Sequence, residues 1–129
     1  MVHVSRGWRL TIWCIYLAIA FAMTHTPAGQ IDNLPDYFSD YILHGIGYFI
    51  LGVLSVWVVL TSRRGLTPRL FLAVYLAILI YATIDERTQP WVGRACELSD
   101  WIADAVGALI GMTIAVVLNR AFAARLASS

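Results

Sequence analysis

Two nine-residue segments carry an ionisable side chain at the same place in an otherwise apolar run. SDYILHGIG at 39–47 contains His44, and SDWIADAVG at 99–107 contains Asp104. In each segment an aspartate, Asp40 or Asp100, precedes that residue by four positions, so on a helix the two polar groups share one face. An imidazole and carboxylates in this arrangement can transfer a proton or hold a hard cation.

A third polar segment, YATIDERTQ at 81–89, places Asp85 and Glu86 at the C-terminal end of an apolar run. The helix dipole is negative at that end, so a cation, a nearby arginine or His44 is expected to compensate the two acids. The candidate catalytic residues are therefore His44, Asp85 and Asp104. The candidate ligands of a divalent cation are Asp85, Glu86 and Asp104, and the candidate substrate-binding residues are Asp40, Glu86, Gln89, Arg94 and Asp100.

The composition indicates that these polar groups belong to a membrane protein. The 129 residues are 60% apolar and only 13% charged, whereas about a quarter of a typical soluble domain is charged. Four apolar segments, at about 8–24, 41–60, 70–87 and 101–118, approach the roughly 17–25 residues that a helix needs to cross a bilayer. We therefore expect one domain over residues 1–129 that folds as an all-α, four-helix transmembrane bundle.

The charges predict the orientation of this bundle. Seven of the nine arginines flank the segments at one end, whereas all eight acids fall in the opposite half. The positive-inside rule then places both termini in the cytoplasm, and the acids at the outer face of a bacterial inner membrane. The alternative is a cleaved signal peptide, with its basic region at Arg6 and Arg9 and a cleavage motif at 20–22 or 26–28.

The two similar segments also predict an internal repeat. Two helical hairpins of the same orientation, related by an axis along the membrane normal, would bring His44 and Asp104 together, with Asp85 beside them. In each copy a serine, Ser99 in the second, suits the N-cap of the helix. Gly47 and Gly107 suit close helix packing, as does the small-residue pattern GALIG at 107–111.

Several functions are excluded or not indicated by the residues. The arginines form topogenic clusters rather than a basic face, so no nucleic-acid partner is expected. The sequence has no glycine-rich phosphate loop or dinucleotide fingerprint. Cys14 and Cys96 belong to opposite ends of the predicted bundle, so we expect two free thiols.

The segments SDYILHGIGYFILG and YATIDERTQPWVGRACELSDWIADAVGALIG resemble the VanZ-like family of small integral membrane proteins. The resemblance covers about residues 36–111. It matches the family pattern at Asp40, His44, Asp85, Glu86, Gln89, Arg94, Asp100 and Asp104. Tyr41 stands where many members carry Lys, and Asp104 where many carry Asn. The resemblance implies a role in the cell envelope, and the family's namesake is associated with low-level teicoplanin resistance.

Three functions remain open at this point. The first is a membrane enzyme on a lipid-linked or envelope substrate, with Asp85 and Asp104 as cation ligands or acid–base groups, His44 as proton shuttle and Arg94 as an anion clamp. The second is a binder or transporter of a lipid carrier, which in a chain of this size favours a homodimer. The third is an accessory module whose polar residues lock helix packing. No nucleophile is indicated, so the sequence does not decide whether catalysis occurs.

Overall fold

The computed structural model describes residues 5–27, 40–60 and 66–128, apart from the side chain of Asp40. The described residues form four long helices, α1 (Arg6–Thr24), α2 (Asp40–Val59), α3 (Pro68–Thr88) and α4 (Leu98–Ala127), with a short 3-10 helix, η2 (Gln89–Val92), between the last two. All four long helices are long and apolar enough to cross a membrane. The predicted all-α, four-helix fold is therefore confirmed.

Local sequence signals set the limits of α1 and α3. The hydroxyl of Ser5 accepts a hydrogen bond from the Trp8 amide at 3.5 Å and caps α1. Thr67 caps α3 in the same way, and Pro68 follows as its first residue, where proline's fixed φ suits the helix and its missing N–H costs nothing. After η2, Gly93 adopts a left-handed φ of 78°, which only glycine reaches without strain.

Helix α4 differs from its prediction at both ends. It begins at Leu98 with Glu97 as N-cap, so the expectation that Ser99 caps it is wrong. Ser99 lies inside the helix, and its hydroxyl donates instead to the Glu97 carboxylate at 3.3 Å. The helix also continues to Ala127 rather than ending near residue 118, because the final segment is rich in alanine, arginine and leucine, which favour helix.

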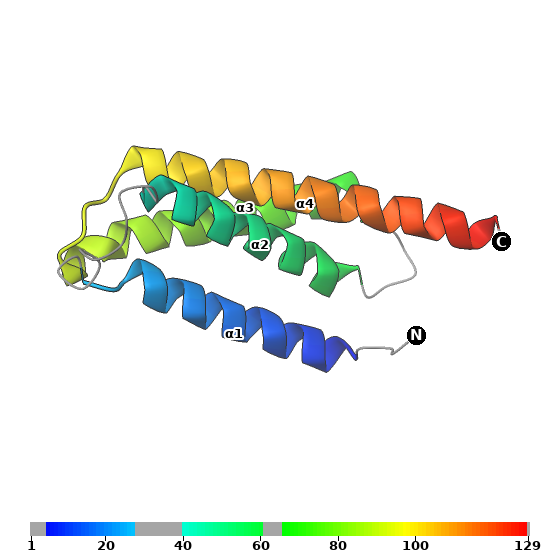
Figure 1. Cartoon of the computed structure of the whole chain (residues 1–129), viewed down its shortest axis with the longest axis horizontal. Coiled ribbons are helices and arrows are strands. Elements are labelled where there is room, and N and C mark those ends of the chain that lie inside the picture. Colours follow the sequence, from blue (N-terminus) through cyan, green and yellow to red (C-terminus); the bar gives the residue numbers. More distant parts are fainter. Residues whose placement is uncertain (1–4, 28–39, 61–65, 129) are drawn as a thin grey trace.

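Helices α2 and α4 form the core of the bundle and run in the same direction (Figure 1). A Cβ at Gly107 would overlap the carbonyl oxygen of Gly45, and one at Gly111 would overlap that of Phe49. The expected close packing of the GALIG segment is thus confirmed, since its glycines let the two backbones touch. Gly47 has no such role, because a Cβ there would meet only the Tyr16 hydroxyl, at 3.8 Å.

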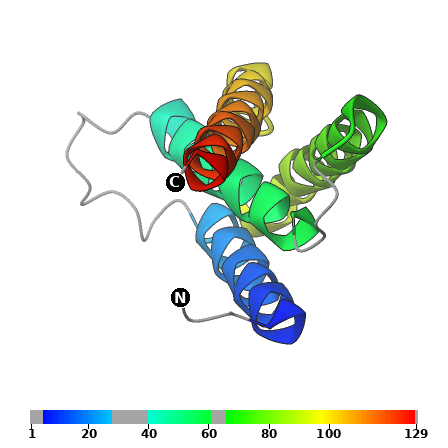
Figure 2. The same cartoon turned by 90° about the vertical axis from the view of Figure 1, so that its right-hand side faces the viewer.

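The outer helices, α1 and α3, are attached to this core by tyrosine hydroxyl donors. Tyr16 of α1 donates to the Gly47 carbonyl of α2 at 2.7 Å, and Tyr75 of α3 donates to the Ala105 carbonyl of α4 at 3.1 Å. In each hairpin a tyrosine of the first helix thus donates to a backbone carbonyl of the second, although the two contacts are not at equivalent positions of the similar segments. Helix α1 has no buried residue of its own and lies on the side of α2 away from α4 (Figure 2).

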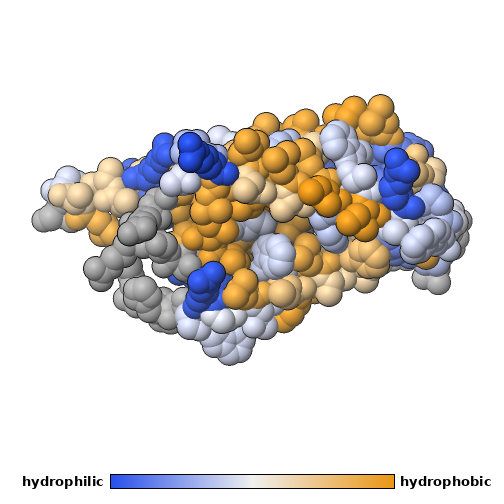
Figure 3. Space-filling view, turned by 180° about the vertical axis from the view of Figure 1, so that it is seen from behind, coloured by the Kyte–Doolittle hydropathy of each residue, from blue (hydrophilic) through white to orange (hydrophobic). Residues whose placement is uncertain are grey.

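The surface of the bundle is a broad apolar band. Many large apolar side chains are exposed along all four helices, and polar residues gather toward the two ends (Figure 3). Such an apolar surface is unfavourable in water but is well suited to contact with lipid tails. Cys14 and Cys96 are both free and exposed, as expected. The start of α1 and the end of α4 lie at the same end of the bundle (Figure 1).

Candidate functional site

His44 is the centre of a buried polar cluster at the opposite end of the bundle. Its Nδ1 lies 3.0 Å from Asp104 Oδ1 and 3.7 Å from Glu86 Oε1. The three residues come from three helices, α2, α4 and α3, and each is at least 96% buried. The close α2–α4 contact places position 44 beside position 104, so the two ionisable residues of the similar segments do meet.

Four carboxylates gather around this one imidazole. One group that could hold an ion is His44, Asp85 and Asp104, and a second is His44, Glu86 and Asp100. Within each group, one ligand atom per residue lies within 4.8 Å of the others. We call the five residues together the acid–histidine site. The three ligands predicted from the sequence are thus divided between two groups that share His44.

Hydrogen-bond donors from other parts of the chain contact Asp85 and Glu86. The Thr24 hydroxyl donates to Asp85 Oδ1 at 2.8 Å, and His25 Nδ1 lies 3.5 Å from the same oxygen. Glu86 Oε2 accepts from the Glu97 amide at 3.1 Å, and Oε1 accepts from the Gln89 amide at 3.4 Å. These polar contacts and His44 offset the unfavourable helix dipole at this end of α3. His44 was one of the alternatives predicted for that role.

The acid–histidine site is rich in hydrogen-bond acceptors. Nδ1 of His44 faces two carboxylates and is assigned the proton, which leaves Nε2 as an acceptor. Among the described residues, four buried acceptor atoms lack a hydrogen-bond partner: His44 Nε2, Asp85 Oδ2, Asp104 Oδ2 and Gln89 Oε1. Buried acceptors and carboxylates are unfavourable without a positive partner, so the site fits a divalent cation or protons.

The other predicted residues belong to the segments at the same end of the bundle. Gln89 is fully buried and contacts Glu86. Arg94 is half-buried in the connection before α4, where its amide donates to the Gln89 carbonyl at 3.2 Å. Asp40 begins α2, and its side chain lies outside the described part of the chain. Arg87 is exposed.

Four residues beside the acid–histidine site were not predicted from the sequence. Thr24 and His25 reach it from the end of α1. Tyr48 and Tyr81 lie one turn from His44 and Asp85, their rings 6.0 Å apart, and both buried hydroxyls lack a partner. Helical spacing from the two predicted residues could have identified the tyrosines. For Thr24 and His25 the only signal was the polar run of Thr24, His25 and Thr26 at the end of α1.

Comparison with known proteins identifies the chain at the level of a family. A family model described as VanZ/LLP1 matches residues 10–119, which is most of the chain and includes the whole acid–histidine site. No curated protein and no solved structure matches it.

Proposed function

The chain belongs to the VanZ/LLP1 family, and from that premise we propose that the acid–histidine site binds a divalent cation and, through it, the anionic head group of a lipid-linked or cell-envelope substrate. The observation that carries the proposal is the set of buried acceptors without a partner at and beside this site: His44 Nε2, Asp85 Oδ2, Asp104 Oδ2 and Gln89 Oε1. Oxygen ligands with one imidazole suit a hard or borderline cation, and such a cation retains open positions for a phosphate or carboxylate.

The residues take separate roles in this proposal. Asp85 and Asp104 act with His44 as one ligand group, and Glu86 and Asp100 act with His44 as the second. In a catalytic version His44 would not be a ligand: its Nε2 would accept a proton from the substrate, while Nδ1–H, hydrogen-bonded to Asp104, would give one to that carboxylate. Gln89 positions Glu86, and Arg94 and Asp40 keep the substrate-binding role predicted for them from the sequence.

A second candidate is binding or transport of a lipid carrier without chemistry. One observation favours it. Within each hairpin a tyrosine of the first helix donates to a backbone carbonyl of the second, and parallel hairpin repeats are typical of some transporters. Turnover of a lipid-linked substrate separates the two candidates, because only the first predicts a product.

The proposal places the acid–histidine site at the outer face of a bacterial inner membrane. The arginines that flank α1, α3 and α4 at the other end support this orientation by the positive-inside rule. A green fluorescent reporter fused behind residue 129 is expected to be fluorescent, and alkaline phosphatase at the same point is expected to be inactive. Active phosphatase there would place the site on the cytoplasmic side instead.

The function is tested by cation binding of the purified protein in nanodiscs. We expect Mg²⁺, Mn²⁺ or Zn²⁺ to raise the unfolding temperature, since a ligand at 100 times its Kd adds about 2.7 kcal/mol of stability. His44→Ala removes the ligand that both groups share, and it is expected to abolish the shift.

The same pair of proteins can be compared in cells. Expression of the wild type is expected to raise tolerance to teicoplanin, and His44→Ala at equal abundance in the membrane is expected not to. No cation-dependent shift in the wild type, together with full tolerance in His44→Ala, would overturn the proposed function and leave the polar residues a packing role.

A further inference from the structure

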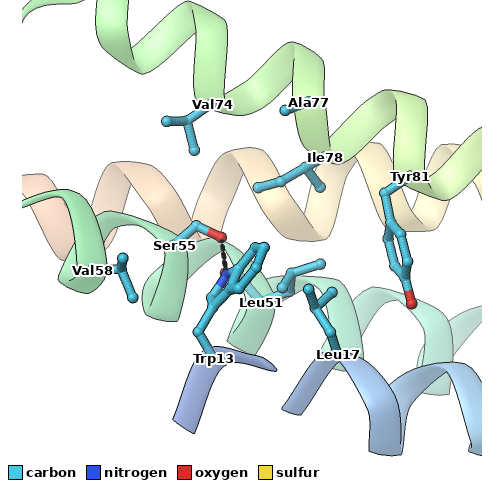
Figure 4. Close-up of a pocket in the computed structure, with 9 residues that line it drawn as sticks. All are labelled: Trp13, Leu17, Leu51, Ser55, Val58, Val74, Ala77, Ile78 and Tyr81. Atoms are coloured by element: carbon cyan, nitrogen blue, oxygen red, sulfur yellow. Dashed lines mark hydrogen bonds between the residues drawn. The ribbon is translucent and has the colours of Figure 1, made fainter. Parts of the chain in front are cut away.

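An apolar groove lies between α1, α2 and α3 (Figure 4). Its volume is about 240 Å³. It is lined by Trp13, Leu17, Leu51, Ser55, Val58, Val74, Ala77, Ile78 and Tyr81. The Ser55 hydroxyl is already engaged, because it accepts from Trp13 Nε1 at 2.9 Å and donates to the Leu51 carbonyl at 2.7 Å. Apart from the Tyr81 hydroxyl, the lining residues therefore offer a bound apolar chain no side-chain hydrogen-bonding group that is not already engaged.

The groove leads to the acid–histidine site along all three of its walls. On α3, Asp85 lies one turn beyond Tyr81. On α2, His44 lies two turns before Leu51, and on α1, Thr24 lies two turns beyond Leu17. The Thr24–Asp85 hydrogen bond at 2.8 Å joins α1 to α3 at that end. Helices α2 and α3 thus contribute to both the apolar groove and the acid–histidine site, whereas α1 lines the groove and contacts Asp85 through Thr24.

Two tyrosine hydroxyls lie between the apolar groove and the acid–histidine site. Tyr81 reaches from α3 toward α2 (Figure 4), and its ring lies 6.0 Å from that of Tyr48. Neither hydroxyl has a hydrogen-bond partner within the usual geometric limits, and the carboxylates of Asp85 and Asp104 lie beside both of them. Buried hydroxyls normally find an acceptor, and a phosphate oxygen would suit a tyrosine O–H as well as a carboxylate does.

We propose that this groove holds the hydrocarbon chain of a single-chain lipid phosphate whose head group lies at Tyr48, Tyr81 and the acid–histidine site. The inference rests on the proposed function and names its substrate class. An apolar cavity of about 150 Å³ in another protein takes up benzene, so 240 Å³ accommodates part of one hydrocarbon chain. The bilayer supplies that chain directly, because Ala77 on the groove wall is exposed on the lipid-facing surface.

A photolabelling experiment tests the groove. The probe is a prenyl phosphate with a diazirine in its chain, in phosphatidylcholine nanodiscs that contain the full protein. Labelling is expected at groove residues of α1 and α3. It is expected to be lost in Ala77→Trp, whose indole fills the groove, and retained in Leu76→Trp, which places the same indole on the neighbouring lipid-facing position. Equal labelling of the groove in both variants, or labels spread over the exposed apolar band, would overturn the proposal.

Competition and cation binding complete the test. Unlabelled prenyl phosphate is expected to displace the probe, and the matching prenyl alcohol is expected to displace it far less. Equal displacement by the alcohol would overturn the link between the groove and the polar site. Ala77→Trp is expected to keep the cation-dependent rise in unfolding temperature. Phosphate-dependent labelling without any cation effect would refute the proposed function alone, whereas a cation effect without groove labelling would refute this inference alone.

Discussion

Asp85→Asn is expected to weaken divalent-cation binding by about 100-fold or more, since even outer partners of metal ligands contribute 10–100-fold. Asp85 is 1% exposed, and its Oδ2 has no hydrogen-bond partner. Asparagine has nearly the same size and keeps an oxygen that can accept from Thr24 at the position of Oδ1. The substitution therefore removes the charge while it leaves the fold intact. Isothermal titration with Mn²⁺ measures the loss of affinity.

Glu97→Gln is the matched control for this substitution. Glu97 is an acid at the same end of the bundle, but its side chain is exposed and is not part of either ligand group. The Glu97→Gln protein is expected to bind the cation with the affinity of the wild type. If Asp85→Asn also bound Mn²⁺ with wild-type affinity, Asp85 would not be a ligand, and the group of His44, Glu86 and Asp100 would carry the binding alone.

Gly107→Ala is expected to destabilise the bundle by about 1–3 kcal/mol, the usual cost of overfilling a packed contact. The added methyl group would overlap the Gly45 carbonyl oxygen, which is backbone and cannot rotate away. Separation of α2 from α4 would also lengthen the 3.0 Å contact between His44 and Asp104. We therefore expect a lower unfolding temperature in detergent, together with weaker cation binding.

Gly47→Ala provides the control at the equivalent place of the first segment. A Cβ there meets only the Tyr16 hydroxyl at 3.8 Å, an ordinary contact. Alanine favours helix by about 1 kcal/mol over glycine, so this variant is expected to be as stable as the wild type or more so. Equal stability of the two variants would contradict the close α2–α4 contact on which the site depends.

Most of the fold follows from the sequence. Apolar length and the breaks between segments predicted all four helices, because a bilayer requires about 20 apolar residues and internally satisfied backbone for each crossing. The predictions were less accurate at the ends. Ser99 was assigned as a cap although α4 begins one residue before it, and the helix extends nine residues beyond its predicted end at 118. Capping and propensity signals are weak and local, so neighbouring contacts decide the last turn.

The residues of the acid–histidine site were found from the sequence because burial of charge in an apolar segment is costly and therefore conspicuous. His44, Asp85 and Asp104 stood out for that reason, and the structure places them in one group. The contributions of Thr24, His25, Tyr48 and Tyr81 were not predicted, since hydroxyls and a histidine at a helix end are ordinary in a membrane protein. Their importance depends on which helix lies opposite.

The sequence by itself thus determined that the chain is a helical membrane protein with its acids gathered at one end, because hydropathy and charge act on each segment independently. Only the tertiary structure decided which acids meet His44, which glycine brings α2 against α4, and that a groove between α1 and α3 leads to the site. Those features depend on the rotation of each helix about its axis and on its partner. These are fixed by side-chain packing between segments far apart in the chain.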